Sequence, residues 1–357
     1  MIRKEKGRGA VSNRAGRFAR QTVEHVDDEW ADELDALPKL ETIVRAETAK
    51  SIIARNQSPD VPFEQSINPY RGCEHACVYC YARPTHSYLD LSPGLDFENR
   101  LFYKQNAVEL LETELRKPGY VCKPITIGAN TDPYQPIERE LRITRGLLEL
   151  MLEYRHPVSL ITKGALIERD LDLLVELARL DLVSVHVSVT SLDDELKRKL
   201  EPRAASAKAR LRVIERLAAT GVPVGVLVAP IIPALTDHEL EAIVEHVAAA
   251  GAHSAGYVLL RLPHEVAGLF TEWLETHYPD RARHVMSLVR QSRGGRDYDS
   301  AWGRRMRGTG RFAELIETRF RLACRRNGLT GRNDRKPRTD LFSPPSRAGD
   351  QLRLGNF

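Results

Sequence analysis

The sequence lacks any long hydrophobic run: no stretch approaches the ~20 apolar residues that span a bilayer. Its opening stretch, MIRKEKGRGAVSNRAGRFARQ, is basic and lacks the apolar segment of a secretory signal, so we expect a cytoplasmic protein. Cysteine is scarce as well, with 5 among 357 residues. This excludes a disulfide scaffold, and clustered thiols in a reducing compartment point to a metal or to catalysis.

Net charge is also small, at +4, but it is unevenly distributed. Residues 281–357 carry 19 Lys and Arg against 7 Asp and Glu, a local charge of +12. Such a region favours contact with a polyanion, as in a nucleic acid, or it keeps the protein soluble, and charge alone does not separate the two. Residues 1–37 join a basic stretch to an acidic one, and we expect them to form a mobile arm.

From about residue 61, short apolar runs alternate with amphipathic helical patterns. The six runs are FEQSIN (63–68), PITIGA (124–129), PVSLIT (157–162), LVSVHVSVT (182–190), VPVGVLVAP (222–230) and AGYVLLRL (255–262). The helical patterns cover 106–117, 144–155, 168–180, 207–221 and 237–251. This alternation predicts an α/β protein with a parallel sheet and right-handed crossovers. Six units predict a partial (β/α)6 barrel of the TIM type, with a doubly wound open sheet as the alternative.

The chain therefore divides into three predicted parts: an arm over 1–37, the (β/α)6 core over 38–262 and a basic helical C-terminal extension over 263–357. A helical pattern in the extension has an apolar side that we expect to pack. Its residues are Phe312, Leu315, Ile316 and Phe320. Ligands of parallel α/β folds gather at the C-terminal edge of the sheet, so the loops after the strands are where functional residues are expected.

Three of the five cysteines fall within eight positions, in the loop after the first predicted strand. Cys73, Cys77 and Cys80 have C-x3-C-x2-C spacing, which lets all three sulfurs turn toward one centre. A closed zinc site needs four protein ligands, but Cys122 precedes the second strand and Cys324 is distant in sequence. A cubane iron-sulfur cluster held by three thiolates leaves one iron open for a substrate or cofactor. The spacing favours the cluster over zinc.

With Tyr79 as the aromatic residue before the third cysteine, this spacing resembles that of the radical S-adenosylmethionine (SAM) superfamily. The string SINPYRGCEHACVYCYARPTHSYL, followed by DFENRLFYKQNAVELLETEL, is similar to the branch of spore photoproduct lyase-like proteins, often described as DNA repair photolyases. The resemblance runs from about residue 62 to 261, and it implies an activity for the expected fold.

The resemblance implies that Cys73, Cys77 and Cys80 ligate three irons of a [4Fe-4S] cluster, and that the fourth iron binds S-adenosyl-L-methionine. Reduction by one electron then yields a 5′-deoxyadenosyl radical, which abstracts hydrogen from a substrate. The partners implied are a one-electron donor of the flavodoxin or ferredoxin type and a substrate for which nucleic acid is a candidate, with no role for a membrane. Two other functions stay open: a zinc-containing nucleic-acid binding protein, and an iron-sulfur redox sensor without SAM chemistry.

Polar residues after the second and third strands are candidate SAM-binding residues. Asn130 and Asp132 lie where the family often carries Gly-Gly-Glu for the SAM amino group, and the alternative is an Asx turn before Pro133. Lys163 follows the third strand, and the resemblance implies that it pairs with the SAM carboxylate. The alternative for Lys163 is a solvated surface position.

The fourth strand offers two more candidates. Alternation with period two places His186, Ser188 and Thr190 on one face. If this face lines the barrel, Ser188 or Thr190 could bond the SAM ribose or carboxylate, whereas His186 on an apolar strand is more typical of the core.

The sequence departs from spore photoproduct lyases over residues 127–132, which lack the cysteine that donates hydrogen in those enzymes. Repair of a thymine dimer by the same route is therefore not expected. The chain also has no second cysteine cluster after the predicted barrel, which indicates a single-cluster enzyme.

Overall fold

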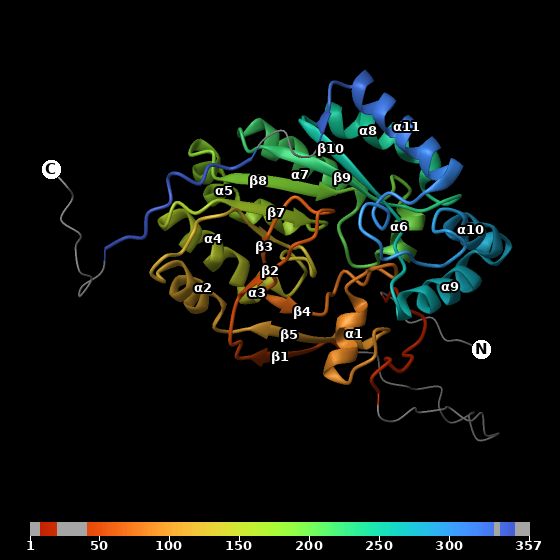
Figure 1. Ribbon diagram of the computed structural model, residues 1–357, viewed down its shortest axis with the longest axis horizontal. Helices are drawn as coiled ribbons and strands as arrows, with labels where there is room; N and C mark the ends of the chain where they lie inside the picture. Colours follow the sequence, from red (N-terminus) through yellow and green to blue (C-terminus); the bar gives the residue numbers. More distant parts are fainter. Residues whose placement is uncertain (1–7, 20–40, 332–335, 347–357) are drawn as a thin grey trace.

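A computed structural model describes residues 8–19, 41–331 and 336–346 of the chain. Its centre is a sheet of eight strands in the order β11-β10-β9-β8-β7-β6-β3-β2 (Figure 1). The strands are β2 (Ile53–Arg55), β3 (Gln65–Ile67), β6 (Ile125–Ile127), β7 (Val158–Thr162), β8 (Val183–Ser188), β9 (Val224–Ile231), β10 (Ser254–Leu259) and β11 (Thr330–Gly331).

The six predicted strands are confirmed as β3, β6, β7, β8, β9 and β10, and neighbours among them pair in parallel. Their spatial order follows their order in the chain, whereas a doubly wound sheet reverses direction at a switch point. The partial (β/α)6 arrangement is therefore confirmed. In the described chain no pairing joins β11 to β2, so the sheet stays open.

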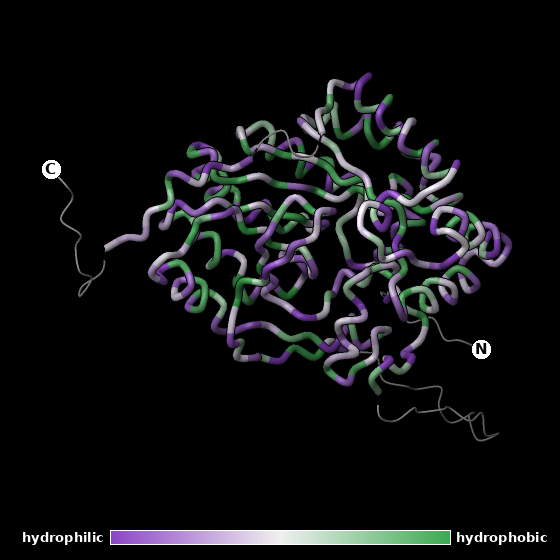
Figure 2. The backbone as a smooth tube through the Cα atoms, viewed as in Figure 1, coloured by the Kyte–Doolittle hydropathy of each residue, from purple (hydrophilic) through white to green (hydrophobic). Residues whose placement is uncertain are grey.

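Helices cover the outside of this sheet because each has one apolar face. They are α2 (Ala107–Leu115), α4 (Ile143–Glu153), α5 (Leu171–Arg179), α7 (Ala207–Ala219) and α8 (Leu240–Ala249). In α7, Val213, Ile214 and Leu217 are buried, and the Ser206 hydroxyl caps the first turn by accepting from the Ala209 N–H at 3.2 Å. The hydrophobic stretches of the chain run along the strands and the adjoining helices (Figure 2).

A second, smaller sheet and several short elements lie beside the C-terminal end of the main strands. The sheet has the order β1-β5-β4, built from β1 (Ile43–Glu47), β5 (Arg100–Lys104) and β4 (Tyr70–Arg71). The short elements are η2 (Arg83–Leu89), α1 (Asp96–Asn99), α3 (Glu138–Leu141), η3 (Ala165–Asp170), α6 (Asp194–Leu200) and η4 (Asp237–Glu239). Sequence periodicity did not predict this sheet, because its strands are short and partly exposed.

The C-terminal extension is helical as expected, with α9 (Glu265–His277), α10 (Pro279–Gln291) and α11 (Gly310–Arg326). Ile316 and Phe320 of α11 are buried in the main core, where the Phe320 ring lies 4.8 Å from that of Tyr257. Leu315 is 53% exposed, so its predicted place on the packed side is wrong. The helix turns by 100° per residue, which leaves Leu315 beside the buried stripe rather than in it.

The expectation of a mobile N-terminal arm is wrong for residues 8–19. The backbone N–H groups of Gly9 and Ala10 donate to the Glu98 carboxylate at 3.0 and 2.8 Å, and Ala10 is buried. The rest of the predicted arm, 1–7 and 20–37, lies outside the described residues. The division between core and extension at 262 and 263 stays a prediction. Within the described ranges, no helix is both long and apolar enough to cross a membrane.

Candidate functional site

The cysteine loop runs from β4 to η2 and turns sharply at two points. Gly72 has φ +78°, and a Cβ there would lie 2.6 Å from Leu101 Cδ2 and 2.9 Å from the Phe97 carbonyl oxygen, so only glycine fits. Ala76 also has a positive φ, 58°. The loop is anchored where the Cys73 N–H donates to the Phe97 carbonyl at 2.9 Å. These turns bring three cysteines that are near in sequence to one side of the loop.

Cys73, Cys77 and Cys80 all line one cavity of about 520 Å³, and none of them forms a disulfide. Burial raises the pKa of each of the three thiols, which favours the neutral thiol; a bound cation would favour the thiolate instead. Among the described residues, no three Cys, His, Asp or Glu side chains converge on a single metal ion. Each ligand of a cubane cluster binds a different iron. The three thiols can therefore hold such a cluster without converging on a single metal ion.

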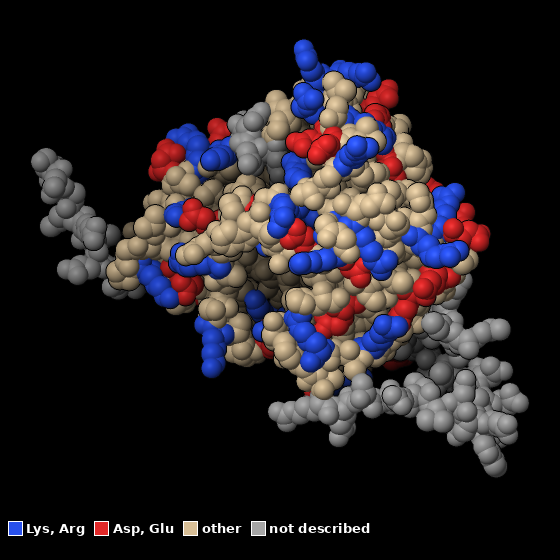
Figure 3. Space-filling model, turned by 45° about the vertical axis from the view of Figure 1, so that its right-hand side comes forward, with Lys and Arg blue, Asp and Glu red and all other residues tan. Residues whose placement is uncertain are grey.

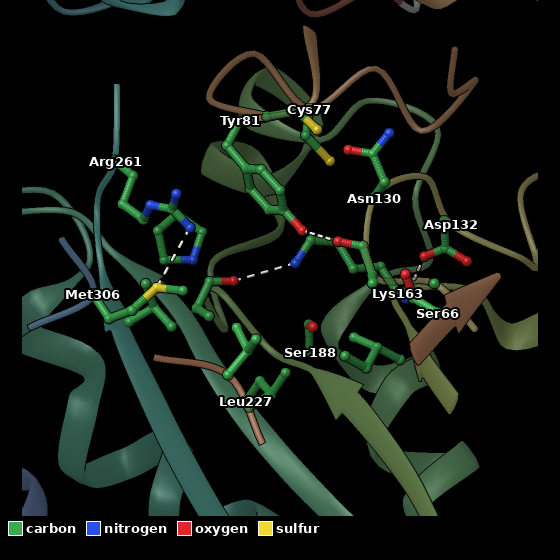
Figure 4. Close-up of a pocket in the computed structure, with 18 of the residues that line it drawn as sticks. Ser66, Cys77, Tyr81, Asn130, Asp132, Lys163, Ser188, Leu227, Arg261 and Met306 are labelled. Carbon is green, nitrogen blue, oxygen red and sulfur yellow. Dashed lines mark hydrogen bonds between the residues drawn. The ribbon is translucent and has the colours of Figure 1, made fainter. Parts of the chain in front are cut away.

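The cavity lies where the parallel strands end, as predicted. Its wall combines the cysteine loop with residues in the C-terminal parts of β7, β8, β9 and β10 and in the loops after β6, β7 and β10, and Figure 4 shows side chains from these elements turned toward one space. Cys122 and Cys324 are not among the lining residues. The cavity therefore gathers the three clustered cysteines and leaves the two isolated ones elsewhere.

Asp132 lines this cavity, and its carboxylate links three parts of the site. Oδ1 accepts from the Thr162 hydroxyl at 2.7 Å and from the Tyr134 N–H at 2.9 Å, the second of which is an Asx turn. Oδ2 accepts from the Lys163 N–H at 2.7 Å and lies 3.2 Å from His75 Nδ1. Burial alone would raise the pKa of Asp132, but the charge of His75 and these hydrogen bonds lower it. Asp132 thus ties the cysteine loop to the end of β7.

Asn130 and Lys163 also line the cavity. The Asn130 N–H donates to Asn68 Oδ1 at 2.9 Å, and its side chain lies below the cysteine loop in Figure 4. The Lys163 ammonium donates to the Ala229 carbonyl at 3.2 Å and lies 3.8 Å from Glu201 Oε1. Lys163 is therefore held at the inner wall, and the alternative of a solvated surface lysine is wrong.

Of the two candidates from the fourth predicted strand, Ser188 lines the cavity and Thr190 does not. Ser188 ends β8, is buried and lines the cavity. Thr190 lies beyond the end of the strand, where period-two alternation no longer applies, and it is not a lining residue. Its Oγ1 lies 2.7 Å from Glu201 Oε1 and 3.0 Å from the Ala229 carbonyl oxygen. The prediction that Thr190 shares the cavity face of Ser188 is therefore wrong.

Glu201 is a buried residue of the site that sequence reasoning missed. Its carboxylate pairs with Arg210 and accepts from the Tyr79 hydroxyl. Burial alone would raise the pKa of Glu201, but the charges of Arg210 and Lys163 lower it strongly. The network holds Tyr79, and with it the cysteine loop, against the ends of β8 and β9. A single glutamate after a helical stretch carries no pattern that could have revealed it.

The N-terminal segment 8–19 covers the outer side of the cysteine loop. Val11 packs in one apolar cluster with Cys77, Val78 and Tyr79. The Asn13 side chain exchanges two hydrogen bonds with Asp96, at 3.1 and 3.0 Å. Residues far apart in the sequence thus shield the thiols from one side.

We expect Gly9→Ala to displace this segment from the loop. A Cβ at Gly9 would lie 1.9 Å from the Ala76 carbonyl oxygen, a backbone atom that cannot move without distorting the loop. If the three thiols hold an iron-sulfur cluster, the variant should take up less iron and lose its cluster absorbance faster in air than the wild type. Gly268→Ala is the matched control, because its Cβ meets only the flexible end of the Arg14 side chain. Equal rates of absorbance loss in both variants would contradict the shielding role.

Comparison with known proteins gives a consistent result. A family model described as the radical SAM superfamily matches residues 67–247. The uncharacterized protein Rv2578c of Mycobacterium tuberculosis is 39% identical over 243 residues, covering 67% of this chain and 72% of that protein. The uncharacterized protein MJ0683 of Methanocaldococcus jannaschii is 28% identical over 173 residues, covering 48% and 62%.

Solved structures share the architecture at lower identity. A spore photoproduct lyase complexed with dinucleoside spore photoproduct has a TM-score of 0.58 and 15% identity, with 81% of each chain covered. A variant of that enzyme with bound AdoMet and the same photoproduct has a TM-score of 0.58 and 16% identity, covering 81% of this chain and 80% of the other. At this identity the likeness concerns the fold alone.

Proposed function

This chain belongs to the radical SAM superfamily and is a radical SAM enzyme, and from that premise we propose that Cys73, Cys77 and Cys80 hold a [4Fe-4S] cluster that binds SAM at its fourth iron. When bound, such a cluster supplies the one-electron reductive cleavage of SAM to a 5′-deoxyadenosyl radical, which abstracts hydrogen from the substrate. One observation carries the proposal: the three clustered thiols, and neither of the other two cysteines, line the cavity at the strand ends.

The chain's own residues supply the polar contacts that SAM requires. The Lys163 ammonium uses one of its three donors on the Ala229 carbonyl and can turn another toward a carboxylate. Ser188 and Asn130 offer a hydroxyl and an amide on the same cavity. Asp132 acts as a positioning residue, since its carboxylate is occupied by Thr162 and by backbone N–H groups.

Water exclusion is the second contribution of the fold. Cys73 and Cys77 are each 7% exposed, and the N-terminal segment and the Glu201 network close the loop from two sides. A reactive radical requires such a protected space, because water and oxygen would divert it.

For the partners, we propose an electron donor of the flavodoxin or ferredoxin type and a nucleic-acid substrate. The basic region 281–357 supports a polyanionic substrate through its local charge of +12. Among the described residues, the cluster ligands are the only cysteines on the cavity. We therefore do not propose that a cysteine of this chain donates hydrogen to the product.

The proposal predicts that anaerobically reconstituted protein binds about four irons per chain and releases 5′-deoxyadenosine from SAM after reduction with dithionite. Iron content, visible absorbance and chromatography of the nucleoside product are the measurements. A colourless protein with about one zinc would instead support a structural zinc site. A cluster that forms without binding SAM would support a redox sensor. Either outcome would overturn the proposed function.

A further inference from the structure

Arg261 follows β10 and lies on the cavity wall with Met306, across from Asp132 and Lys163 (Figure 4). Its guanidinium carbon lies 5.0 Å from the centre of the Tyr81 ring, a cation-π distance. The Tyr81 hydroxyl in turn donates to the Ala129 carbonyl. The ring, one residue after the third cysteine, thus holds the guanidinium beside the cysteine loop.

The donors of this guanidinium are poorly satisfied. Nη1 lies 3.4 Å from the Met306 sulfur, a weak acceptor, and Nη2 lies 3.4 Å from the Tyr298 hydroxyl oxygen. Nε is buried without a hydrogen-bond partner among the described residues. No described carboxylate lies within ion-pair distance of Arg261, whereas Arg305 on the same cavity pairs with Asp60. Arg261 is half-buried, and a buried donor such as its Nε normally has a hydrogen-bond partner.

A second buried guanidinium, that of Arg293, lies near Arg261. Arg293 is 2% exposed and spends its donors on backbone carbonyls, including Leu259 at 3.1 Å and Leu260 at 2.7 Å. Burial, together with the nearby charge of Arg261, lowers the pKa of Arg293 to about 10. Arg304 and Arg305 of the 292–309 loop pair with Asp299 and Asp60. Arg261 and Arg293 form no ion pair with a described carboxylate, so these two cations are left without an anion.

We infer that Arg261 binds a phosphate of the substrate, and that this substrate is a nucleic-acid strand whose reacting nucleoside enters the cavity. The inference rests on the proposed function, since it assigns the substrate of that same site. The planar guanidinium fork matches a phosphate in two hydrogen bonds. The proposed partners of the SAM carboxylate, Lys163 and Ser188, lie at the ends of β7 and β8, whereas Arg261 follows β10. Arg261 is therefore left for a different anion.

An aromatic side chain on the cavity favours a strand over an isolated anion. Tyr81 lines the cavity and is 43% exposed, and Arg261 and Arg305 line the same cavity. Exposed aromatic side chains next to arginines are the surface on which bases of single strands stack. One face of the molecule is hollowed, with Lys and Arg side chains at the rim of the hollow (Figure 3).

The test compares two probes on the anaerobically reconstituted protein with SAM present: thymidylyl-thymidine, which contains one phosphodiester, and thymidine, which has none. Binding is followed by calorimetry at fixed salt. We expect Arg261→Met to weaken dinucleotide binding by about 10- to 100-fold, since a hydrogen bond to a charged group is lost, and to leave thymidine binding unchanged. Arg261→Lys should lose less, because it keeps the charge without the fork.

Arg290→Met is the matched control, because Arg290 is exposed, pairs with Asp297 and lies outside the cavity. It should bind the dinucleotide as the wild type does. Equal dinucleotide affinity in Arg261→Met and the wild type would overturn the inference. So would a loss of SAM affinity in Arg261→Met with unchanged dinucleotide affinity, which would assign Arg261 to the SAM carboxylate. Release of 5′-deoxyadenosine from SAM is measured separately. Failure of the proposed function would abolish this product, whereas failure of the present inference would change only the dinucleotide affinities.

Discussion

Replacing Cys77 with Ala is expected to abolish both the iron-sulfur absorbance and the release of 5′-deoxyadenosine from SAM. The cluster would be held by three thiolates, and the variant keeps only two of them. The cavity has no other described cysteine that could replace the missing ligand. The substitution removes only a sulfur from a side chain that is 7% exposed, so the fold should survive and the loss should be specific. The measurements are iron content, the visible spectrum and the nucleoside product under anaerobic conditions.

Cys122→Ala provides the control for this experiment. Cys122 is partly buried, lies before β6 and does not line the cavity. Its loss should leave the spectrum and the product yield at wild-type values. If Cys77→Ala kept about four irons and full product yield, the assignment of the cluster ligands would be wrong.

Local periodicity explains why so much of the core could be predicted. A parallel strand that is covered on both faces must be apolar throughout, and a helix that covers it must show one apolar stripe. Both patterns are visible within a few residues of sequence, so β9 and α7 were found close to their observed bounds. The place of the cysteine loop followed from the same patterns, since loops after parallel strands share one edge.

Contacts between distant residues explain what the sequence alone did not predict. The pairing of Gly9 and Ala10 with Glu98 joins positions almost ninety residues apart, and neither end carries a periodic signature. The partners of Glu201 come from the cysteine loop, from the residue that follows β7 and from α7, so its role exists only in the folded chain. Thr190 failed for a simpler reason: the alternation was extended past the last residue of the strand.

Glu98→Ala is expected to lower the free energy of unfolding by about 3 to 5 kcal/mol, because it leaves a buried charge without its partner. Glu98 and Arg83 form an ion pair in which both side chains are 0% exposed. Arg83 also donates to the carbonyl of Cys77 at 2.9 Å, so the pair supports the cysteine loop directly. The same carboxylate accepts from the N–H groups of Gly9 and Ala10, which would both lose their acceptor.

The shift in the urea midpoint of the iron-free protein measures this loss, and the iron taken up on reconstitution measures its effect on the site. Glu98→Gln should fall between the wild type and Glu98→Ala, because the amide oxygen still accepts hydrogen bonds but carries no charge. Glu176→Ala removes an exposed partner of Arg179 and should change the stability by about 1 kcal/mol or less. If Glu98→Ala shifted the midpoint no more than Glu176→Ala, the buried pair could not be what anchors the N-terminal segment to the cysteine loop. If stability fell but iron uptake did not, the pair would stabilise the fold without shaping the site, and the two measurements together decide between these roles.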